Sequence, residues 1–283
     1  MGDRSQRAPG LGHLAALRAR GAAATGGSRT PGEGTRRLDF DDPASLDLTG
    51  VATLVLVSAG YAEDDHVIRR HAAVLDAASR DGVRHVVYTS VTTAGDHLGF
   101  APAHRATERL VRACGPSWTI LRNGLYAELF GGLLMWAGDA VESPFGDGAL
   151  AAVVREDLAD AAAIVAADPA AHSGRVHDLV GTPITAGQVA DRLGVPHRAI
   201  GLGEYRRRLG EEMPGLLPFQ PPMLASIATG IRHGFLDGTT PDLTDLLGRP
   251  ARDPLATAVA AAAATRTASP RRRTDPAGGP ARR

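Results

Sequence analysis

The sequence contains no lysine and only one cysteine. All 31 basic residues are therefore arginine, which excludes Schiff-base chemistry, a phosphate-loop lysine and any proton relay through an ammonium group. Cys114 has no second cysteine for an intrachain disulfide or a cysteine-based metal cluster. The histidines show no metal-ligand spacing, so we assign no metal site.

Net charge and long apolar runs are lacking as well. The 31 basic and 31 acidic residues give a net charge of zero, which favours neither nucleic acid nor an anionic membrane as a partner. No run approaches the roughly 20 apolar residues that span a bilayer, and residues 1–30 lack the apolar centre of a signal peptide. We expect a cytoplasmic protein that binds neither membrane nor nucleic acid.

Between residues 51 and 126, short apolar runs alternate with helix-like stretches. The runs cover residues 51–57, 83–88 and 117–121, and small polar residues follow each of them. Unbroken apolar runs of this length are typical of parallel strands buried on both faces. Such sheets bind ligands beyond the carboxyl ends of their strands. Ser58, Thr89, Ser90 and Asn123 are therefore expected beside a nucleotide cofactor or its substrate.

The rest of the sequence predicts further helices, and the regular alternation of strands and helices becomes weaker in the second half. Asp41 to Pro43 is a helix-start signal, and Gly146 to Gly148 is typical of a hairpin turn between two short segments. Thr185 is a candidate helix cap. Residues 265–283 are rich in Arg, Pro and Gly and are expected to be disordered. The main predicted helices cover residues 64–79, 102–113, 155–167, 183–193, 204–213, 223–233 and 241–247.

Six short stretches, in one order, carry a family resemblance. They are residues 38–43, 83–90, 104–108, 119–126, 155–158 and 242–250. Together they resemble the NmrA-like branch of the short-chain dehydrogenase/reductase superfamily, and within it the bacterial NAD(P)H:quinone oxidoreductases. The resemblance implies a Rossmann-type, doubly wound parallel sheet with a small, mostly helical C-terminal lobe and a binding cleft between them.

This fold implies a division of the chain. Residues 35–180 would form the Rossmann-type NAD(P)-binding domain, and residues 181–250 the small substrate lobe. Residues 1–34 are an irregular, degenerate start of the dinucleotide-binding domain. Residues 251–283 are an Ala/Arg-rich tail whose end is expected to be disordered.

The beginning of the chain departs from the family pattern. The family opens with an apolar strand and a G-x-x-G-x-x-G fingerprint, whereas here only Gly10 and Gly12 are available and residues 1–7 are polar. A phosphate site needs a strand, glycines and a helix N-terminus together. Three explanations stay open: an incorrect start or frame disruption, a true variant with a makeshift phosphate loop, or a protein that has lost cofactor binding.

The resemblance also suggests which residues hold the adenosine end of the cofactor. Arg29 follows a weak strand, where the family places a basic residue against the 2′-phosphate of NADPH. Asp39 follows the next strand, where the family places a carboxylate near the adenine amino group. The alternatives are an ordinary loop arginine and a helix-capping carboxylate.

Other residues are expected near the reacting end of the cofactor. Ser58, with small neighbours, would let the ribose approach the backbone, and Thr89 and Ser90 would lie near the nicotinamide. The alternatives are an ordinary loop after the first strand and a strand end that satisfies its own backbone.

Three residues are candidates for the catalytic side of the cleft. The superfamily's Tyr-x-x-x-Lys pair is absent, and His104 stands where the branch often carries lysine or histidine. It would contact the nicotinamide ribose or protonate a reduced quinone oxygen, although a lone histidine is more often structural. Asn123 and Tyr126 would orient the substrate, or form a tight turn with Tyr126 packed against the lobe.

The resemblance implies an NAD(P)H-dependent oxidoreductase that reduces a quinone or similar small acceptor. NADPH is the expected cofactor and NADH the alternative. The expected assembly, where the protein forms one, is a homodimer. The alternative functions are a non-catalytic NAD(P)-sensing NmrA-like regulator, or a truncated chain with impaired cofactor binding.

Overall fold

The central sheet forms from the apolar runs of the sequence. The computed structural model describes residues 9–58, 62–212 and 215–268. In these residues, four parallel strands lie in the order β3-β4-β5-β9. Their bounds are Thr53–Leu56 (β3), His85–Val91 (β4), Ser117–Asn123 (β5) and Arg175–Leu179 (β9). Every residue of β4 is buried, as expected for a parallel sheet covered on both faces. The predicted α/β fold is confirmed.

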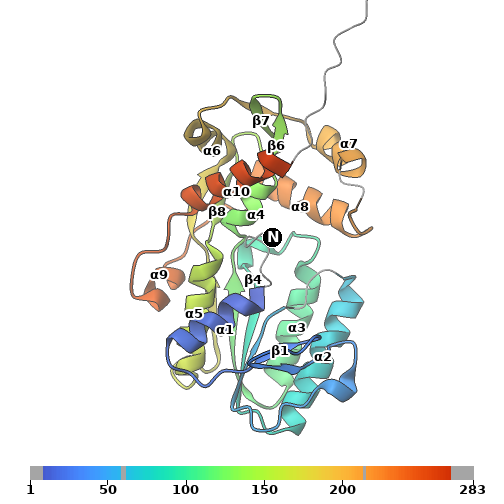
Figure 1. Cartoon of the computed structure of the whole chain (residues 1–283), viewed down its shortest axis with the longest axis vertical. Coiled ribbons are helices and arrows are strands. Elements are labelled where there is room, and N and C mark those ends of the chain that lie inside the picture. The colour runs from blue at the N-terminus through green and yellow to red at the C-terminus, as the bar shows by residue number, and fades with distance from the viewer. Residues whose placement is uncertain (1–8, 59–61, 213–214, 269–283) are drawn as a thin grey trace, which may run out of the picture.

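Helices cover both faces of this sheet (Figure 1). Because neighbouring residues of a strand point to opposite faces, Val86 and Tyr88 pack with α2 and α3, whereas Val87 packs with α5. Helix α1 lies on the outside of α5. The bounds are Pro9–Ala19 (α1), Asp64–Arg80 (α2), Ala101–Ala113 (α3) and Arg155–Ala167 (α5).

The N-terminal strands form a separate sheet. Strands β1 (Gly26–Ser28) and β2 (Thr35–Arg37) pair in parallel with each other, and β3 is the edge strand of the central sheet. These parallel strands are therefore divided between two sheets, and the predicted degenerate start stays a prediction.

Two local predictions in this region need correction. Gly10 and Gly12 were expected in a turn before a helix, but both lie within α1 (Pro9–Ala19). The helix predicted from Asp42 is a single 3-10 turn, Pro43–Ser45.

Residues 127–152 and most of residues 182–268 build a lobe beyond the carboxyl edge of the central sheet (Figure 1). Helix α4 begins directly after β5, and the helix α6 is capped by Thr185 in a capping box with Gln188, so the predicted cap is confirmed. Helix α9 packs on α5 and β9. The helices are α4 (Ala127–Gly132), α6 (Ala186–Leu193), α7 (Leu202–Glu212), α8 (Gln220–Arg232), α9 (Asp242–Leu247) and α10 (Pro254–Ala268).

The lobe also contains short strands. Their pairing shows that the hairpin predicted at Gly146–Gly148 is wrong. The two strands beside that turn belong to different sheets: β7 pairs with β6 and β11, whereas β8 pairs with β10. The turn packs against α8 so closely that a Cβ at Gly148 would overlap the carbonyl of Ile231. The strands are β6 (Met135–Ala137), β7 (Ala140–Ser143), β8 (Ala149–Ala152), β10 (Thr182–Thr185) and β11 (His197–Ala199).

The alanine-rich end of the described chain is a helix. Helix α10 returns to pack on α4, where a Cβ at Gly131 would overlap the backbone of Ala258. Of the residues predicted to be disordered, 265–268 belong to α10 and 269–283 lie outside the described residues. Over the described residues, no helix is long and apolar enough to cross a membrane.

Candidate functional site

Three of the predicted polar residues lie toward the carboxyl ends of neighbouring strands in the central sheet. The backbone N–H of Ser58, just after β3, donates to Thr89 Oγ1 on β4 at 3.0 Å. Asn123 is the last residue of β5 and lies opposite Val91 in the parallel register. Parallel pairing brings these strand ends to one edge, as the sequence predicted.

Thr89 and Ser90 lie within β4 rather than after it, which corrects the predicted strand end. Neighbouring strand residues point to opposite faces, so the two hydroxyls have different surroundings. Thr89 faces Ser58, whereas the Ser90 hydroxyl donates to Glu108 Oε1 at 2.7 Å. The predicted cofactor contact of Ser90 stays a prediction, although its hydroxyl already has a buried protein acceptor.

Asn123 carries a buried polar atom that has no partner in the described part of the chain. Its side chain is buried and Oδ1 receives no hydrogen bond, while its backbone carbonyl accepts from Thr92 N–H at 2.8 Å. Next to it, the Gly124 N–H donates to the carbonyl of Leu179 at 2.8 Å. A buried acceptor without a donor is unfavourable by about 1–3 kcal/mol, so this amide is suited to a bound ligand.

His104 lies on α3 and contacts a tyrosine that sequence reasoning did not single out. The hydroxyl of the fully buried Tyr88 and His104 Nδ1 are 3.0 Å apart. Burial and the charge of Arg105 lower the pKa of His104 to about 4. The imidazole is therefore neutral at pH 7, and it acts as a hydrogen-bonding group rather than as a cation.

Tyr88 itself is held in the neutral form. Burial raises the pKa of its phenol, and hydrogen bonds with Thr107 and Ser58 oppose that rise only in part. Tyr88 was missed because it stands inside the apolar run of β4, where an aromatic residue is indistinguishable from core. The position of His104, four residues before the buried Glu108 on the same helix, was visible in the sequence.

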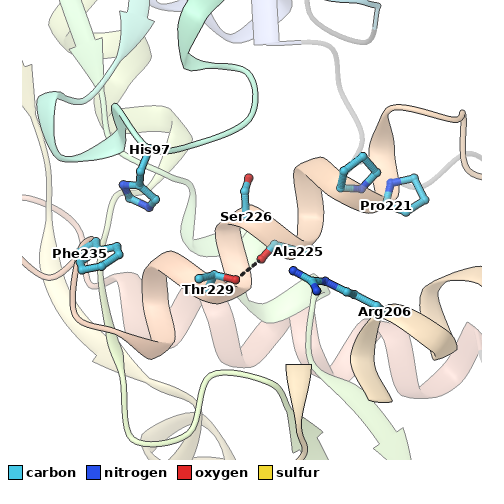
Figure 2. Close-up of a pocket in the computed structure, with 8 residues that line it drawn as sticks. His97, Arg206, Pro221, Ala225, Ser226, Thr229 and Phe235 are labelled. Atoms are coloured by element: carbon cyan, nitrogen blue, oxygen red, sulfur yellow. Dashed lines mark hydrogen bonds between the residues drawn. The ribbon is translucent and has the colours of Figure 1, made fainter. Parts of the chain in front are cut away.

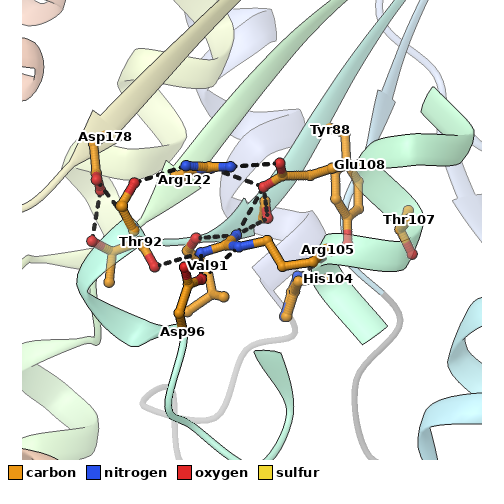
Figure 3. A network of polar contacts seen from close by, with 12 residues as sticks. Tyr88, Val91, Thr92, Asp96, His104, Arg105, Thr107, Glu108, Arg122 and Asp178 are labelled. Atoms are coloured by element: carbon orange, nitrogen blue, oxygen red, sulfur yellow. Dashed lines mark hydrogen bonds and ion pairs between the residues drawn. The ribbon is translucent and has the colours of Figure 1, made fainter. Parts of the chain in front are cut away.

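Glu108 organises a buried ion cluster beside this edge (Figure 3). Its carboxylate, only 2% exposed, receives N–H groups from Arg105 at 2.8 Å, Arg112 at 3.2 Å and Arg122 at 2.7 Å. Ser90 donates a further hydrogen bond. Burial alone would raise the pKa of Glu108, but these donors and charges outweigh it and lower the pKa to about 2. Glu108 is therefore an anion at any physiological pH.

The same cluster fixes the loop that follows β4. Arg105 contacts Asp96 at 2.5 Å and donates to the carbonyl of Thr92 at 2.9 Å. The Thr92 hydroxyl donates to Asp178 on β9 at 2.6 Å, and Arg122 donates to the Thr93 hydroxyl at 2.8 Å. These contacts join β4, β5, β9 and α3 at the end of the sheet where a ligand would bind.

Tyr126 lies at the start of α4, half-buried, with its ring under the guanidinium of Arg155 at 5.4 Å. Arg155 also contacts Glu128 at 3.5 Å. A cation held over the ring is a stabilising contact, and it matches the packing alternative considered from the sequence. The predicted substrate contact of Tyr126 stays a prediction.

The residues predicted for the adenosine end lie at the ends of the separate two-stranded sheet. Arg29 follows β1 and is exposed. Asp39 follows β2, where its Oδ1 accepts from the N–H of Asp41 at 3.0 Å. Gly12 is exposed on α1. Their roles in cofactor binding, together with that of Gly10, stay predictions.

A cavity of about 620 Å³ opens beside the loop after β4, within the range of small-molecule sites. Its walls come from that loop and from the lobe, and none of the predicted site residues lines it. Sequence reasoning had no signal for it, since its walls are distant in the chain. Among the described residues, no group of His, Cys, Asp and Glu side chains is arranged to hold a metal ion.

The chain is similar in sequence to known oxidoreductases. No protein-family model matches the chain. Quinone oxidoreductase 2 of Escherichia coli (strain K12) is 33% identical over 230 residues, which cover 76% of this chain and 78% of that protein. The NmrA-like family domain-containing oxidoreductase flvB of Aspergillus flavus is 34% identical over 109 residues, 36% of each chain.

One solved structure extends the likeness to both the sheet and the lobe. The crystal structure of Citrobacter sp. triphenylmethane reductase complexed with NADP(H) has a TM-score of 0.78 and 26% identity to this chain. It covers 91% of this chain and 97% of its own. The arrangement of strands and lobe described above is therefore shared over nearly the whole length of both molecules.

Proposed function

The chain belongs to the NmrA-like family of atypical short-chain dehydrogenases/reductases, and from this membership we propose that it is an NADPH-dependent oxidoreductase. The acceptor is a quinone or a similar small molecule, as the name of the Escherichia coli relative suggests. The solved relative is complexed with NADP(H), which supports NADPH over NADH.

The observation that carries this proposal is the buried, unpartnered Oδ1 of Asn123 at the carboxyl edge of the sheet. A ligand donor such as a carboxamide N–H or a ribose hydroxyl would satisfy it. Ser58 and Thr89 share that edge, so these three residues would hold the reacting end of the cofactor. NADPH, when bound, supplies a hydride.

The protein's own groups then need to position rather than to protonate. Hydride transfer depends mainly on the orientation of donor and acceptor and on exclusion of water. The neutral imidazole of His104, oriented by Tyr88, is suited to hydrogen bonding a ribose hydroxyl or an acceptor oxygen. This role accords with a chain that has no lysine.

The test is NADPH oxidation with 1,4-benzoquinone, run beside NADPH binding measured by fluorescence. We expect turnover, with Asn123→Ala weakening NADPH binding about tenfold because one buried hydrogen bond is lost. Gln188→Ala removes an amide from the exposed capping box of α6 and serves as the control, with unchanged binding. A protein that neither binds nor oxidises NADPH would contradict the proposal.

A second candidate is a non-catalytic NAD(P) sensor. One observation favours it: Gly10 and Gly12, expected in the phosphate turn, lie within helix α1 instead, so these two glycines do not supply the turn that a phosphate site needs. NADPH binding without turnover of any quinone would support this function.

Other aspects of the protein are still predictions from the sequence. They include a cytoplasmic location, a homodimer, and the absence of nucleic-acid binding.

A further inference from the structure

The cavity beside the loop after β4 has chemically different ends (Figure 2). His97 and Phe235 lie at one end, and Arg206 reaches toward the cavity from α7 at the other. Ser226 and Thr229 of α8 lie between them. The volume of about 620 Å³ is sufficient for an aromatic molecule of two or three rings.

The first end offers aromatic surface. The rings of His97 and Phe235 meet edge to face, 5.0 Å apart at 71°, and Phe235 is 52% exposed. Gly230 permits this arrangement, because a Cβ there would overlap the His97 imidazole. An exposed phenyl ring fixed in this way is suited to stacking against a planar ligand.

The hydroxyl groups between the two ends are already used. The Ser226 hydroxyl donates to the carbonyl of Met223 at 2.7 Å and accepts from Gly99 N–H at 3.1 Å. The Thr229 hydroxyl donates to the carbonyl of Ala225 at 2.8 Å. Each hydroxyl proton is therefore committed to the protein, so the middle of the cavity offers no strong donor to a ligand.

Arg206 is the cationic donor of the cavity, and it differs from the two arginines that follow it. Arg207 pairs with Glu211 at 2.6 Å, and Arg208 pairs with Glu142 at 2.6 Å. Arg206 is exposed and, over residues 9–58, 62–212 and 215–268, has no ion-pair partner. A guanidinium without a carboxylate, set at the end of an aromatic cavity, is suited to bidentate binding of an anionic group.

We infer that this cavity binds planar aromatic acceptors that carry a carboxylate or sulfonate group. The anionic group pairs with Arg206, and the ring system lies against His97 and Phe235. The inference rests on the proposed function, since it names the class of acceptor that binds there. It predicts that a charged quinone is preferred over its neutral counterpart.

Binding is tested first, with two dyes and without any cofactor. 1-Anilinonaphthalene-8-sulfonate and N-phenyl-1-naphthylamine share the same ring system, and only the first has a sulfonate. We expect Arg206→Gln to raise the Kd of the sulfonate dye about tenfold and to leave that of the neutral dye unchanged, as loss of one charge-assisted pair implies. Arg207→Gln is the matched control, and it should change neither Kd.

Two further observations belong to the same experiment. Phe235→Ala should weaken both dyes equally, because it removes ring contact without changing charge. Added salt should reduce the difference between the dyes, since Arg206 is exposed and its charge is screened over about 8 Å at physiological ionic strength.

Turnover is tested with 1,2-naphthoquinone and its 4-sulfonate. Arg206→Gln should lower kcat/KM for the sulfonate about tenfold and leave the neutral quinone unaffected. If neither quinone is reduced but Arg206 still discriminates between the dyes, the proposed function is wrong and the anion site stands. If both quinones are reduced and Arg206→Gln affects both equally or neither, the anion site is wrong and the function stands.

Discussion

The two parallel sheets of this protein are held together in different ways. The four-stranded sheet has a strand, β4, in which every residue is buried, and its polar groups are joined by the Glu108 cluster. The two-stranded sheet consists of three-residue strands that are half-buried or exposed. Its ion pairs, Arg37 with Asp42 and Asp41 with Arg70, lie near the surface.

The difference shows what burial does to charge. A surface ion pair contributes little because water screens it and long side chains lose entropy. A buried carboxylate with three guanidinium partners is different, because removing one side leaves uncompensated charge in a poorly hydrated region. We therefore expect the four-stranded sheet to respond strongly to pH and substitution, and the two-stranded sheet to respond weakly.

Acidification should give the largest effect. Burial, with the charges of His104 and Arg70, lowers the pKa of His71 to about 3, and His104 has a pKa of about 4. Unfolded histidines take up protons near pH 6.5, so the free energy of unfolding falls as pH drops from about 7 toward 4. Urea unfolding at pH 7 and pH 5 measures this loss.

Substitution of one buried histidine measures how much of this pH dependence comes from that residue. His71→Gln should remove part of the pH dependence, whereas His66→Gln, an exposed position on the same helix, should leave it intact. Equal pH dependence in the wild type and His71→Gln would show that buried imidazoles are not its source.

Loss of the Glu108 carboxylate should rank next. Glu108→Ala leaves Arg105, Arg112 and Arg122 without their shared anion, and we expect a loss of about 3–5 kcal/mol in unfolding free energy. Glu204→Ala, at an exposed position in α7, is the control and should change stability by less than about 0.5 kcal/mol. Chemical denaturation measures the unfolding free energy of each variant. Similar losses of stability in both variants would show that the buried Glu108 cluster is no more important than a surface charge.

A pair of glycine substitutions compares the sheets directly. A Cβ at Gly124 would lie 3.1 Å from the carbonyl oxygen of Leu179 and 3.3 Å from Val180 Cα, both backbone atoms. We expect Gly124→Ala to lose about 1–3 kcal/mol by overpacking. A Cβ at Gly27 would come nearest to Leu38 Cδ1, at 2.6 Å. Because this atom is the far end of a side chain that can move away, Gly27→Ala should lose less. Thermal unfolding of both variants measures the difference, and the reverse order would contradict it.

The smallest effect is expected at the surface of the two-stranded sheet. Asp41→Asn removes the charge that Arg70 contacts at 2.7 Å while keeping the side-chain shape. Because Asp41 is exposed and water screens its charge, Tm should fall by less than about 2 °C. A fall as large as that of Glu108→Ala would show that this half of the molecule is not weakly coupled.

Much of the fold could be predicted because it depends on local periodicity. The apolar runs located β3, β4 and β5, and the helical pattern located α2, α3 and α5 within a few residues. Thr185 was recognised as a candidate cap because it stands near the start of a helical stretch, and the structure adds its partner Gln188. Predictions failed where the outcome depended on distant packing, as at Gly146–Gly148, where the turn meets α8 instead of closing a hairpin.

In the candidate site, too, some contacts could be predicted from the sequence and others could not. Ser58, Thr89, Ser90 and Asn123 were expected together because parallel strands end at one edge. Ser58 and Thr89 are joined by a hydrogen bond and Asn123 ends the neighbouring strand, whereas Ser90 turns toward Glu108. The partnership of Tyr88 with His104 and that of Ser90 with Glu108 were not predicted. Both depend on how α3 is rotated against β4, and a sequence pattern specifies the helix but not its rotation.

The sequence alone determined which segments become strands and helices, and that the strand ends carry polar side chains. It also excluded lysine chemistry outright. Only the tertiary structure decided that Ser90 of β4 and Arg122 of β5 contact Glu108, and that His97 and Arg206 share one cavity. The physical reason is that periodicity and capping act over a few residues, whereas side chains 100 residues apart meet only after the whole chain has packed.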